Sequence, residues 1–400
     1  MTTAPRPSSR LTAIDALRGA VIVLMTLDHT RDFFHAGAMA FSPEDLTRTT
    51  PILFLSRWIT HVCAPVFLFT AGVGAFLRLQ RPGSTRSQLS RFLWTRGLWL
   101  VLVELTVMRL AMNFSFDARY PVLLLVLWAL GISMVALALL VHLPHRMLAV
   151  LSLAVIALHN ILDGIQASQL GVLAGLWNVL HQSGVFVVGG VPVVVGYPVV
   201  PWVAVMAAGF GAGPIFLLAP EARRRVVLRW GTILIVGFVV LRAVNLYGDP
   251  VPWSGQPSAA LTVISFFRTT KYPPSLAFLL MTMGPALLAL AYLDRRGSRT
   301  SNPLVVLGRV PLFYYVVHFW TLHVLASLFA WLRYGTASLA FLFNPLPSMG
   351  GPRDLFPADF GYPLWVVYAV WIGVVALLYP LCRWFAGFKA RRRDWWLSYV

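Results

Sequence analysis

About ten stretches of some 20 mainly apolar residues run through this chain and limit what it can fold into. As an α-helix, a stretch of about that length spans the roughly 30 Å hydrocarbon core of a bilayer. Apolar side chains make up 58% of the 400 residues and charged ones only 12%, which excludes an ordinary soluble domain. The sequence therefore predicts an all-α polytopic membrane protein with about ten transmembrane helices. The stretches are 12–34, 51–77, 92–113, 120–141, 146–163, 198–218, 226–247, 273–293, 310–332 and 363–386.

Basic residues indicate which side of the membrane each connection faces. Arginine-rich runs occupy alternate gaps, at 78–96, 223–229, 295–309 and 383–393. Because cytoplasmic loops carry the excess of Lys and Arg, both termini are expected in the cytoplasm of a multi-pass protein of the cell (inner or plasma) membrane. The net charge of +18 comes largely from these runs. We therefore expect the lipid bilayer, and no nucleic acid, as a partner; a homodimer is left open.

The chain is expected to form one membrane domain with two tails. Residues 1–10 are a basic cytoplasmic tail, 11–386 a single transmembrane domain, and 387–400 a basic, aromatic cytoplasmic tail. The outer connections are the longer ones. Among them, 164–197 is too short and too broken by Gly and Pro for two more crossings, so we expect an interfacial or re-entrant piece there. Residues 256–270 are expected to form another interfacial helix.

The first apolar segment carries more charge than a membrane helix normally tolerates. Ionisable groups inside a bilayer are functional candidates because they are costly there, and this segment holds Asp15, Arg18, Asp28, His29, Arg31 and Asp32. Arg18 and His29 are eleven positions apart, so a helix puts them on nearly one line, about 16 Å apart along its axis. Asp15 shares the Arg18 face at i−3, and Asp32 the His29 face at i+3. The structural alternative is an anchoring Asp15–Arg18 ion pair with an interfacial histidine.

Four residues in later segments are candidates for contacting a substrate. Arg57 and His61 begin the second segment on one helical face, at i and i+4. Lys271 is one of only two lysines and precedes the eighth segment, where it could hold an anion at the outer mouth. His318 stands among aromatic residues of the ninth segment. Arg57 with His61 could instead be an interfacial arginine with a packed histidine, and His318 a hydrogen-bonded packing residue.

Other polar residues in the apolar segments are predicted to be structural. Glu104 lies inside the third segment and needs a polar partner there. His142, His145, His159 and His181 show no evident partner in the sequence. Neither a zinc-ligand spacing nor a glycine-rich phosphate loop is recognisable, so no metal site is predicted.

Together the charged residues predict a cation at the inner end of the first segment and an imidazole with carboxylates at its outer end. Histidine is the usual general base, and Asp28 or Asp32 could orient it. The planar guanidinium of Arg18 suits phosphate, so a long, phosphate-bearing acyl donor entering from the cytoplasm would fit the spacing. A proton-coupled transporter or flippase of an anionic or sugar-lipid substrate could use the same residues, although no internal repeat is visible. A non-catalytic scaffold or sensor would not require them.

Several motifs carry a family resemblance. The start R-L-T-A-I-D-A-L-R-G-(x9)-H resembles the arginine-x10-histidine signature of integral membrane acyltransferases. Narrower motifs resemble the bacterial branch of the heparan-alpha-glucosaminide N-acetyltransferase catalytic-domain family, from about residue 10 to the C-terminus. They are M-T-L-D-H-T-R-D-F-F-H, R-W-I-T-H-V-C-A-P-V-F-L-F-T-A-G, Y-P-V-V-P-W, T-T-K-Y-P-P-S-L, G-R-V-P-L-F-Y-Y-V-V-H and W-L-S-Y-V.

The resemblance implies a membrane acyltransferase that uses cytoplasmic acetyl-CoA, or another acyl-CoA, to acylate a hydroxyl or amine of a sugar-like acceptor on the far side. The family's catalytic histidine follows a polar residue that Asp28 would match. The broader signature favours His29 as that histidine, whereas the animal pattern could favour His35, and both stay open. Arg18 with Asp15 would orient the CoA, while Arg57, His61, Lys271 and His318 would contact the acceptor. The animal enzyme's luminal domain has no counterpart in the sequence, so its substrate is not carried over.

Overall fold

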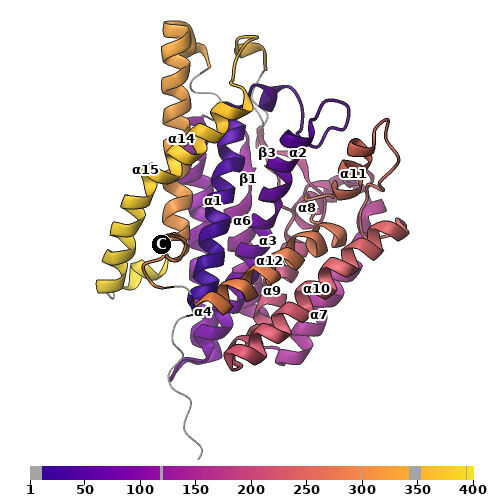
Figure 1. The fold of residues 1–400 in the computed structure, drawn as a ribbon, viewed down its shortest axis with the longest axis vertical. Helices are drawn as coiled ribbons and strands as arrows, with labels where there is room; N and C mark the ends of the chain where they lie inside the picture. The colour runs from indigo at the N-terminus through magenta and orange to yellow at the C-terminus, as the bar shows by residue number, and fades with distance from the viewer. Residues whose placement is uncertain (1–10, 118–119, 298, 342–352, 393) are drawn as a thin grey trace, which may run out of the picture.

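The computed structural model describes residues 11–117, 120–297, 299–341, 353–392 and 394–400, and these are mostly helical (Figure 1). The predicted tail at 1–10 lies outside the described residues. The helices are α1 Thr12–Phe34, α2 Pro51–Trp58, α3 Cys63–Leu79, α4 Arg86–Val103, α5 Arg109–Asn113, α6 Val126–Leu140, α7 His145–Leu158, α8 Ala174–Leu180, α9 Val199–Gly211, α10 Pro220–Val244, α11 Ala259–Phe267, α12 Leu276–Arg296, α13 Pro303–Gly308, α14 Pro311–Tyr334 and α15 Leu364–Arg391.

Within the described residues, 7 helical segments are long and apolar enough to cross a membrane, namely 51–79, 145–164, 199–217, 220–244, 276–296, 311–340 and 364–391. The other three predicted segments are also helical. α1 has the length but carries several charges, α4 continues through a π-helical turn into α5, and α6 is 15 residues long. The all-α polytopic class is thus confirmed. The total of ten crossings and the cytoplasmic termini stay predictions.

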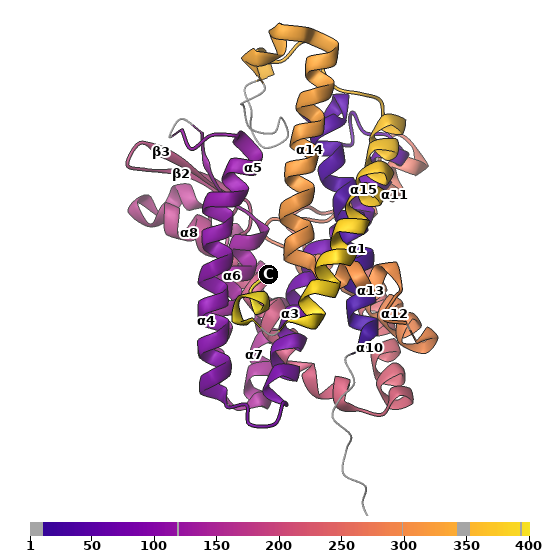
Figure 2. The ribbon, with the colours of Figure 1, turned by 90° about the vertical axis from the view of Figure 1, so that its left-hand side faces the viewer.

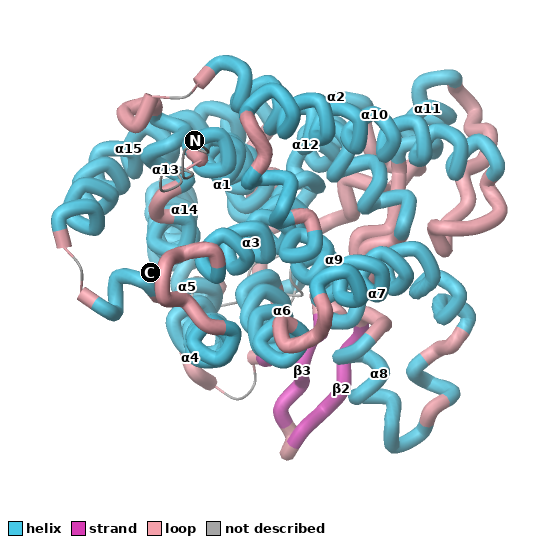
Figure 3. Tube along the Cα trace, turned by 90° about the horizontal axis from the view of Figure 1, so that it is seen from below, coloured by secondary structure: helices cyan, strands magenta, loops and turns pink. Residues whose placement is uncertain are grey.

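Helix α1 lies at the centre of the bundle, in contact with α3, α12, α13, α14 and α15 (Figures 1 and 3). Its closest neighbour is the short helix α13. A Cβ added at Gly19 would lie 1.8 Å from the Leu304 carbonyl oxygen, and one added at Gly308 would lie 1.8 Å from the Asp15 carbonyl oxygen. Only glycine permits this approach, so the backbone itself fixes the N-terminal part of α1.

Other helices pack lengthwise in pairs. α3 lies along α9, and Figure 2 shows α10 along α12 and α4 along α6. Glu104, in the π-helical turn after α4, accepts hydrogen bonds from the backbone N–H groups of Leu127 at 2.7 Å and Trp128 at 3.0 Å. It therefore caps the N-terminus of α6, where a carboxylate is favoured by the helix dipole. The prediction that Glu104 needs a structural partner is confirmed.

The structure also contains a small three-stranded sheet, which the purely helical prediction did not include. Strands β2 Gly184–Val188 and β3 Val191–Val195 form a hairpin, and β1 Val122–Leu124 pairs with β3 in parallel. The run V-F-V-V-G-G-V-P-V-V-V is rich in β-branched residues and carries two glycines at the turn, with φ of 55° and 82°, which is typical of a tight hairpin. The predicted re-entrant piece is thus short helices followed by a hairpin, and the fourth predicted segment turns helical only at Val126.

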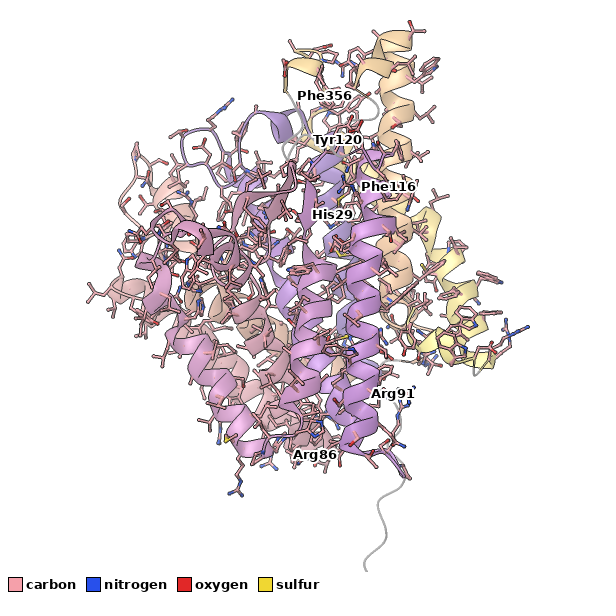
Figure 4. The ribbon with its side chains drawn as sticks, turned by 180° about the vertical axis from the view of Figure 1, so that it is seen from behind. His29, Arg86, Arg91, Phe116, Tyr120 and Phe356 are labelled. Atoms are coloured by element: carbon pink, nitrogen blue, oxygen red, sulfur yellow. The ribbon has the colours of Figure 1, made fainter. Side chains whose placement is uncertain are left out.

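Two smaller predictions can be compared with the structure. The helix expected in 256–270 is α11. The C-terminal residues fold back on α4, where the hydroxyls of Tyr399 and Thr95 are 2.7 Å apart and Arg96 donates to the Ser398 carbonyl. Arg86 and Arg91 lie at the opposite end of the bundle from His29 (Figure 4). We call their end the inner end, which the arginine distribution predicts to be cytoplasmic, and the other the outer end.

Candidate active site

Asp28 is the centre of a buried chain of ion pairs at the outer end of α1. Its Oδ2 lies 2.5 Å from Nη1 of Arg57, and its Oδ1 lies 2.9 Å from Nη2 of Arg31. The same Nη2 donates to Oδ1 of Asp32 at 2.9 Å. Asp28 and Arg31 are 8% and 4% exposed, so these charges are compensated by one another rather than by bulk water.

Glu44 extends this chain from the connection between α1 and α2. Its Oε1 lies 2.8 Å from Nε2 of His61 and 3.4 Å from Nε of Arg57. Burial alone would raise the pKa of the Glu44 carboxyl, but the hydrogen bond and charge of His61, together with Arg57, outweigh it and lower the pKa to about 2. Arg57 and His61 thus share one partner, as their i, i+4 spacing predicts. We call Asp28, Arg31, Asp32, Glu44, Arg57 and His61 the outer cluster.

Lys271 adds a third buried cation beside the outer cluster. It is 7% exposed, and its Nζ lies 5.1 Å from the centre of the Tyr272 ring and 6.0 Å from that of Tyr197. Its charge acts on both Asp28 and Glu44. Burial acts to raise the pKa of the Tyr272 phenol, but Lys271 and Arg57 outweigh it and leave the pKa below its usual value. Tyr272 is therefore a readier proton donor than an ordinary tyrosine.

His29 points away from Asp28 because consecutive residues on a helix diverge by about 100°. Its ring faces α14, 4.3 Å from Phe319, 5.3 Å from His318 and 6.3 Å from Tyr315 between ring centres. Its Nδ1 lies 3.9 Å from Oδ2 of Asp32 and has no hydrogen-bond partner among the described residues. The side chain is 15% exposed. Of the two aspartates predicted to orient this ring, Asp32 is the one that faces it.

His318 has a fixed tautomer in this arrangement. Its Nδ1 lies 3.0 Å from the Tyr314 carbonyl oxygen, which can only accept, so Nδ1 carries a proton. In the neutral ring Nε2 is then an acceptor, and this buried atom has no hydrogen-bond partner among the described residues. The side chain is fully buried beside His29. An unpaired buried acceptor calls for an explanation, and a donor on a ligand or a water would provide one.

His35 lies past the end of α1 and makes a local contact instead. Its Nδ1 accepts a hydrogen bond from the Gly37 N–H at 3.2 Å, which begins the next turn. Burial and the nearby Arg31 hold the pKa of His35 below its usual value, so the ring is neutral at pH 7. A neutral ring that accepts at Nδ1 carries its proton on Nε2, and neither nitrogen is then ready to take another.

The inner end of α1 is built differently. Arg18 donates from Nε to Oγ1 of Thr70 at 2.9 Å and from Nη2 to the Thr70 carbonyl at 2.6 Å, which ties it to α3. Asp15 is buried and lies 3.9 Å from Nε of Arg309. The positive charge of Arg18 is felt at Arg96 on α4. Arg78 acts on Arg96 in the same way, so several like charges lie at this end.

The structure thus brings most of the predicted residues into two groups along α1. Asp28, Asp32, Arg57 and His61 belong to the outer cluster, with His29, His318 and Lys271 beside it, whereas Arg18 and Asp15 lie at the inner end and His35 lies apart. Glu44, Tyr272 and Tyr315 were not predicted. Glu44 and Tyr272 come from irregular connections, where no periodicity signals which way a side chain turns.

These features define a class of protein. A multi-pass helical bundle with a histidine, carboxylates and cations buried at its centre is typical of enzymes and transporters that act within the membrane. The family model for the catalytic region of heparan-alpha-glucosaminide N-acetyltransferase matches residues 10–241, which is more than half of the chain. The chain belongs to that family and is an integral membrane acyltransferase. The match includes α1 and the outer cluster but ends before Lys271 and His318. A search of curated proteins found no match.

Proposed function

We propose that this protein transfers an acetyl or other acyl group from cytoplasmic acyl-CoA to a hydroxyl or amine of a sugar-like acceptor at the outer face of the cell membrane. The observation that carries the proposal is the arrangement around His29. This imidazole lies at the centre of a membrane acyltransferase with Asp32 facing its Nδ1 and His318 beside its ring. It is a general base with an orienting carboxylate in reach.

In the proposed reaction His29 acts on the acceptor. Nε2 of His29 takes the proton from the acceptor O–H or N–H, while Nδ1–H turns to Asp32. The freed oxygen or nitrogen forms a bond to the acyl carbon, the thioester C–S bond breaks, and the thiolate of CoA leaves and takes up a proton. Asp32 supports the imidazolium that forms. The second buried imidazole, His318, can accept a hydrogen bond from the acceptor through Nε2.

Arg18 is proposed to bind the phosphates of the acyl-CoA at the inner end. Its guanidinium is held on α3 by Thr70, close enough to Arg96 for repulsion between the two cations. A phosphate relieves that repulsion, and guanidinium groups bind phosphate in a bidentate manner. About 16 Å of helix separates Arg18 from His29, and the extended pantetheine arm of CoA would bridge that span through one shared passage.

Arg57, His61 and Lys271 are proposed to contact the acceptor at the outer mouth. The support is that these side chains converge on Glu44 and Asp28 at the outer end of α1. A sugar offers several hydroxyls, and such a set of alternating donors and acceptors can bind them. Asp28 would then position Arg57 rather than take part in proton transfer.

The test compares two histidine variants of the purified protein. His29→Ala should lower kcat for acyl transfer, followed as thiol release from acetyl-CoA with a panel of amino sugars and sugar alcohols, by about 100- to 10,000-fold. His35→Ala should stay within a few-fold of the native enzyme. The Tm of each variant is measured alongside, because the packed His29 ring contributes to stability and a loss of kcat counts only in protein that remains folded.

Two outcomes would overturn the proposal. One is a larger kcat loss in His35→Ala than in His29→Ala, which would transfer the role of base to His35. The other is uptake or flipping of a sugar-lipid in proteoliposomes without any acyl-CoA, together with absence of thiol release, which would indicate a transporter.

A further inference from the structure

Two histidines and an aspartate converge at the outer end of α7, away from α1. His159 and Asp163 belong to the short helical turn His159–Gly164, and His181 follows α8. One ligand atom from each residue lies within 4.8 Å of the other two. Nε2 of His181 is 3.2 Å from Oδ1 of Asp163, and the two imidazole rings are 5.6 Å apart at 70°. We call these three residues the His–Asp–His triad.

The imidazole rings of the triad are buried, yet several of their nitrogens make no hydrogen bond within the part of the chain that the structure describes. His159 is 4% and His181 3% exposed. Among the described residues, neither ring nitrogen of His159 has a hydrogen-bond partner, and Nδ1 of His181 has none either. The Pro274 carbonyl is near His159, but its geometry does not make a hydrogen bond. Buried polar atoms without partners are rare in proteins, and a bound ion is one of the few causes.

The chemistry of the two imidazoles and the carboxylate indicates which metal ion they would bind. Imidazole nitrogen with carboxylate oxygen suits Zn²⁺, whereas Mg²⁺ and Ca²⁺ prefer oxygen alone. Ligand atoms about 2.0–2.2 Å from a tetrahedral zinc lie roughly 3.3–3.5 Å from each other. The His181–Asp163 pair, at 3.2 Å, is already close to this spacing, and the His159 ligand atom lies within 4.8 Å of both.

A second layer of contacts orients the carboxylate. Asn160 donates from Nδ2 to Oδ2 of Asp163 at 2.8 Å, which leaves Oδ1 facing the histidines. Such outer partners are usual at metal sites. The Asn160 side-chain oxygen accepts from the Leu276 N–H at 2.9 Å, at the start of α12. The triad is therefore joined to the segment that follows Lys271.

We propose that the His–Asp–His triad binds one zinc ion that holds the irregular segment after α7 to the start of α12. Three protein ligands leave a fourth position for water, and the 17% exposure of the Asp163 side chain gives that water access. The ion would stabilise the outer connections and takes no part in acyl transfer.

The experiment measures metal in the full-length protein, purified in detergent with a tag that contains no histidine. After chelator treatment, the protein is titrated with ZnCl2 alone. We expect about one zinc per chain by elemental analysis and a rise in Tm of several degrees, because an ion that binds only the folded state stabilises it. Co²⁺ in place of zinc should give the visible absorption of a tetrahedral site.

Variants assign the ion to the triad. His159→Ala and Asp163→Asn should lose the zinc and the Tm response, whereas His142→Ala, which removes an exposed histidine at the inner end, should keep both. Zinc below about a tenth per chain with no change in Tm in the native protein would overturn the proposal and leave a hydrogen-bonded triad. Equal zinc in the native and His159→Ala proteins would do the same. If the variants fail to fold, the native titration and the Co²⁺ spectrum decide.

Discussion

The two ends of α1 are fixed by different forces. At the outer end, Asp28 joins Arg31 and Arg57 in a buried chain of opposite charges that continues through Glu44 to His61. At the inner end, the backbones of α1 and α13 touch at Gly19 and Gly308, and cations gather. The comparison teaches that side-chain charges of opposite sign hold the outer end together, whereas backbone contact holds the inner end, where a ligand anion is proposed to bind.

The largest effect is expected from a substitution that forces the α1 and α13 backbones apart at the inner end. Gly308→Ala should prevent folding or cost more than about 3 kcal/mol, because the new methyl would overlap the Asp15 carbonyl and force α13 away. Size-exclusion profiles and thermal unfolding in detergent measure this. The matched control is Gly373→Ala in α15, where no atom lies within 4 Å of the added methyl. Equal behaviour of the two variants would refute the close-contact explanation.

Removal of the Asp28 carboxylate at the outer end is expected to have the next largest effect on the free energy of unfolding. Asp28→Ala should lower the free energy of unfolding by about 3–5 kcal/mol, since it leaves buried Arg31 and Arg57 without their shared carboxylate. Asp359→Ala, which breaks the exposed pair with Arg333, should cost no more than about 1 kcal/mol. A loss at Asp28 as small as that at Asp359 would mean that water reaches the outer cluster.

Acid should weaken the outer end through Glu44. Its folded pKa, at about 2, lies below the ordinary value. The carboxylate therefore stabilises the fold above pH 4.5, and this contribution is lost as the pH falls from about 5 to 2. Because the side chain is 22% exposed, we expect the loss to be about 1–2 kcal/mol. Tm measured between pH 7 and 3 should fall less steeply in Glu44→Gln than in the native protein, and parallel curves would contradict the assignment.

The last test concerns Arg18 at the inner end, where the main expected effect is on substrate binding and the effect on stability overlaps that of Glu44. Arg18→Met should cost about 1–3 kcal/mol at most, because it removes hydrogen bonds to Thr70. It should nonetheless raise the KM for acetyl-CoA at least 10-fold. Arg91→Met, at an exposed arginine of the same end, should leave that KM unchanged. Similar KM values in both variants would exclude a phosphate contact at Arg18.

Helical periodicity made part of this architecture predictable. It put Asp32 beside His29, brought Arg57 and His61 to one partner, and required a partner for Glu104 inside the membrane. It could not show that Glu44 folds back from the connection after α1, or that His159 and His181 meet across an irregular segment. Those contacts join residues whose backbone has no regular repeat, so spacing carries no information about direction. Spacing alone therefore predicts that these histidines are structural, and it predicts no metal site.

The capping of α6 by Glu104 has a consequence for biogenesis. Glu104 is synthesised before Leu127 and Trp128, so its carboxylate and the N–H groups that satisfy it leave the ribosome at different moments. A carboxylate and an open helix terminus are each costly in lipid. If α4 and α6 both cross the membrane, as the sequence predicts, they should leave the insertion machinery together, as a preassembled hairpin.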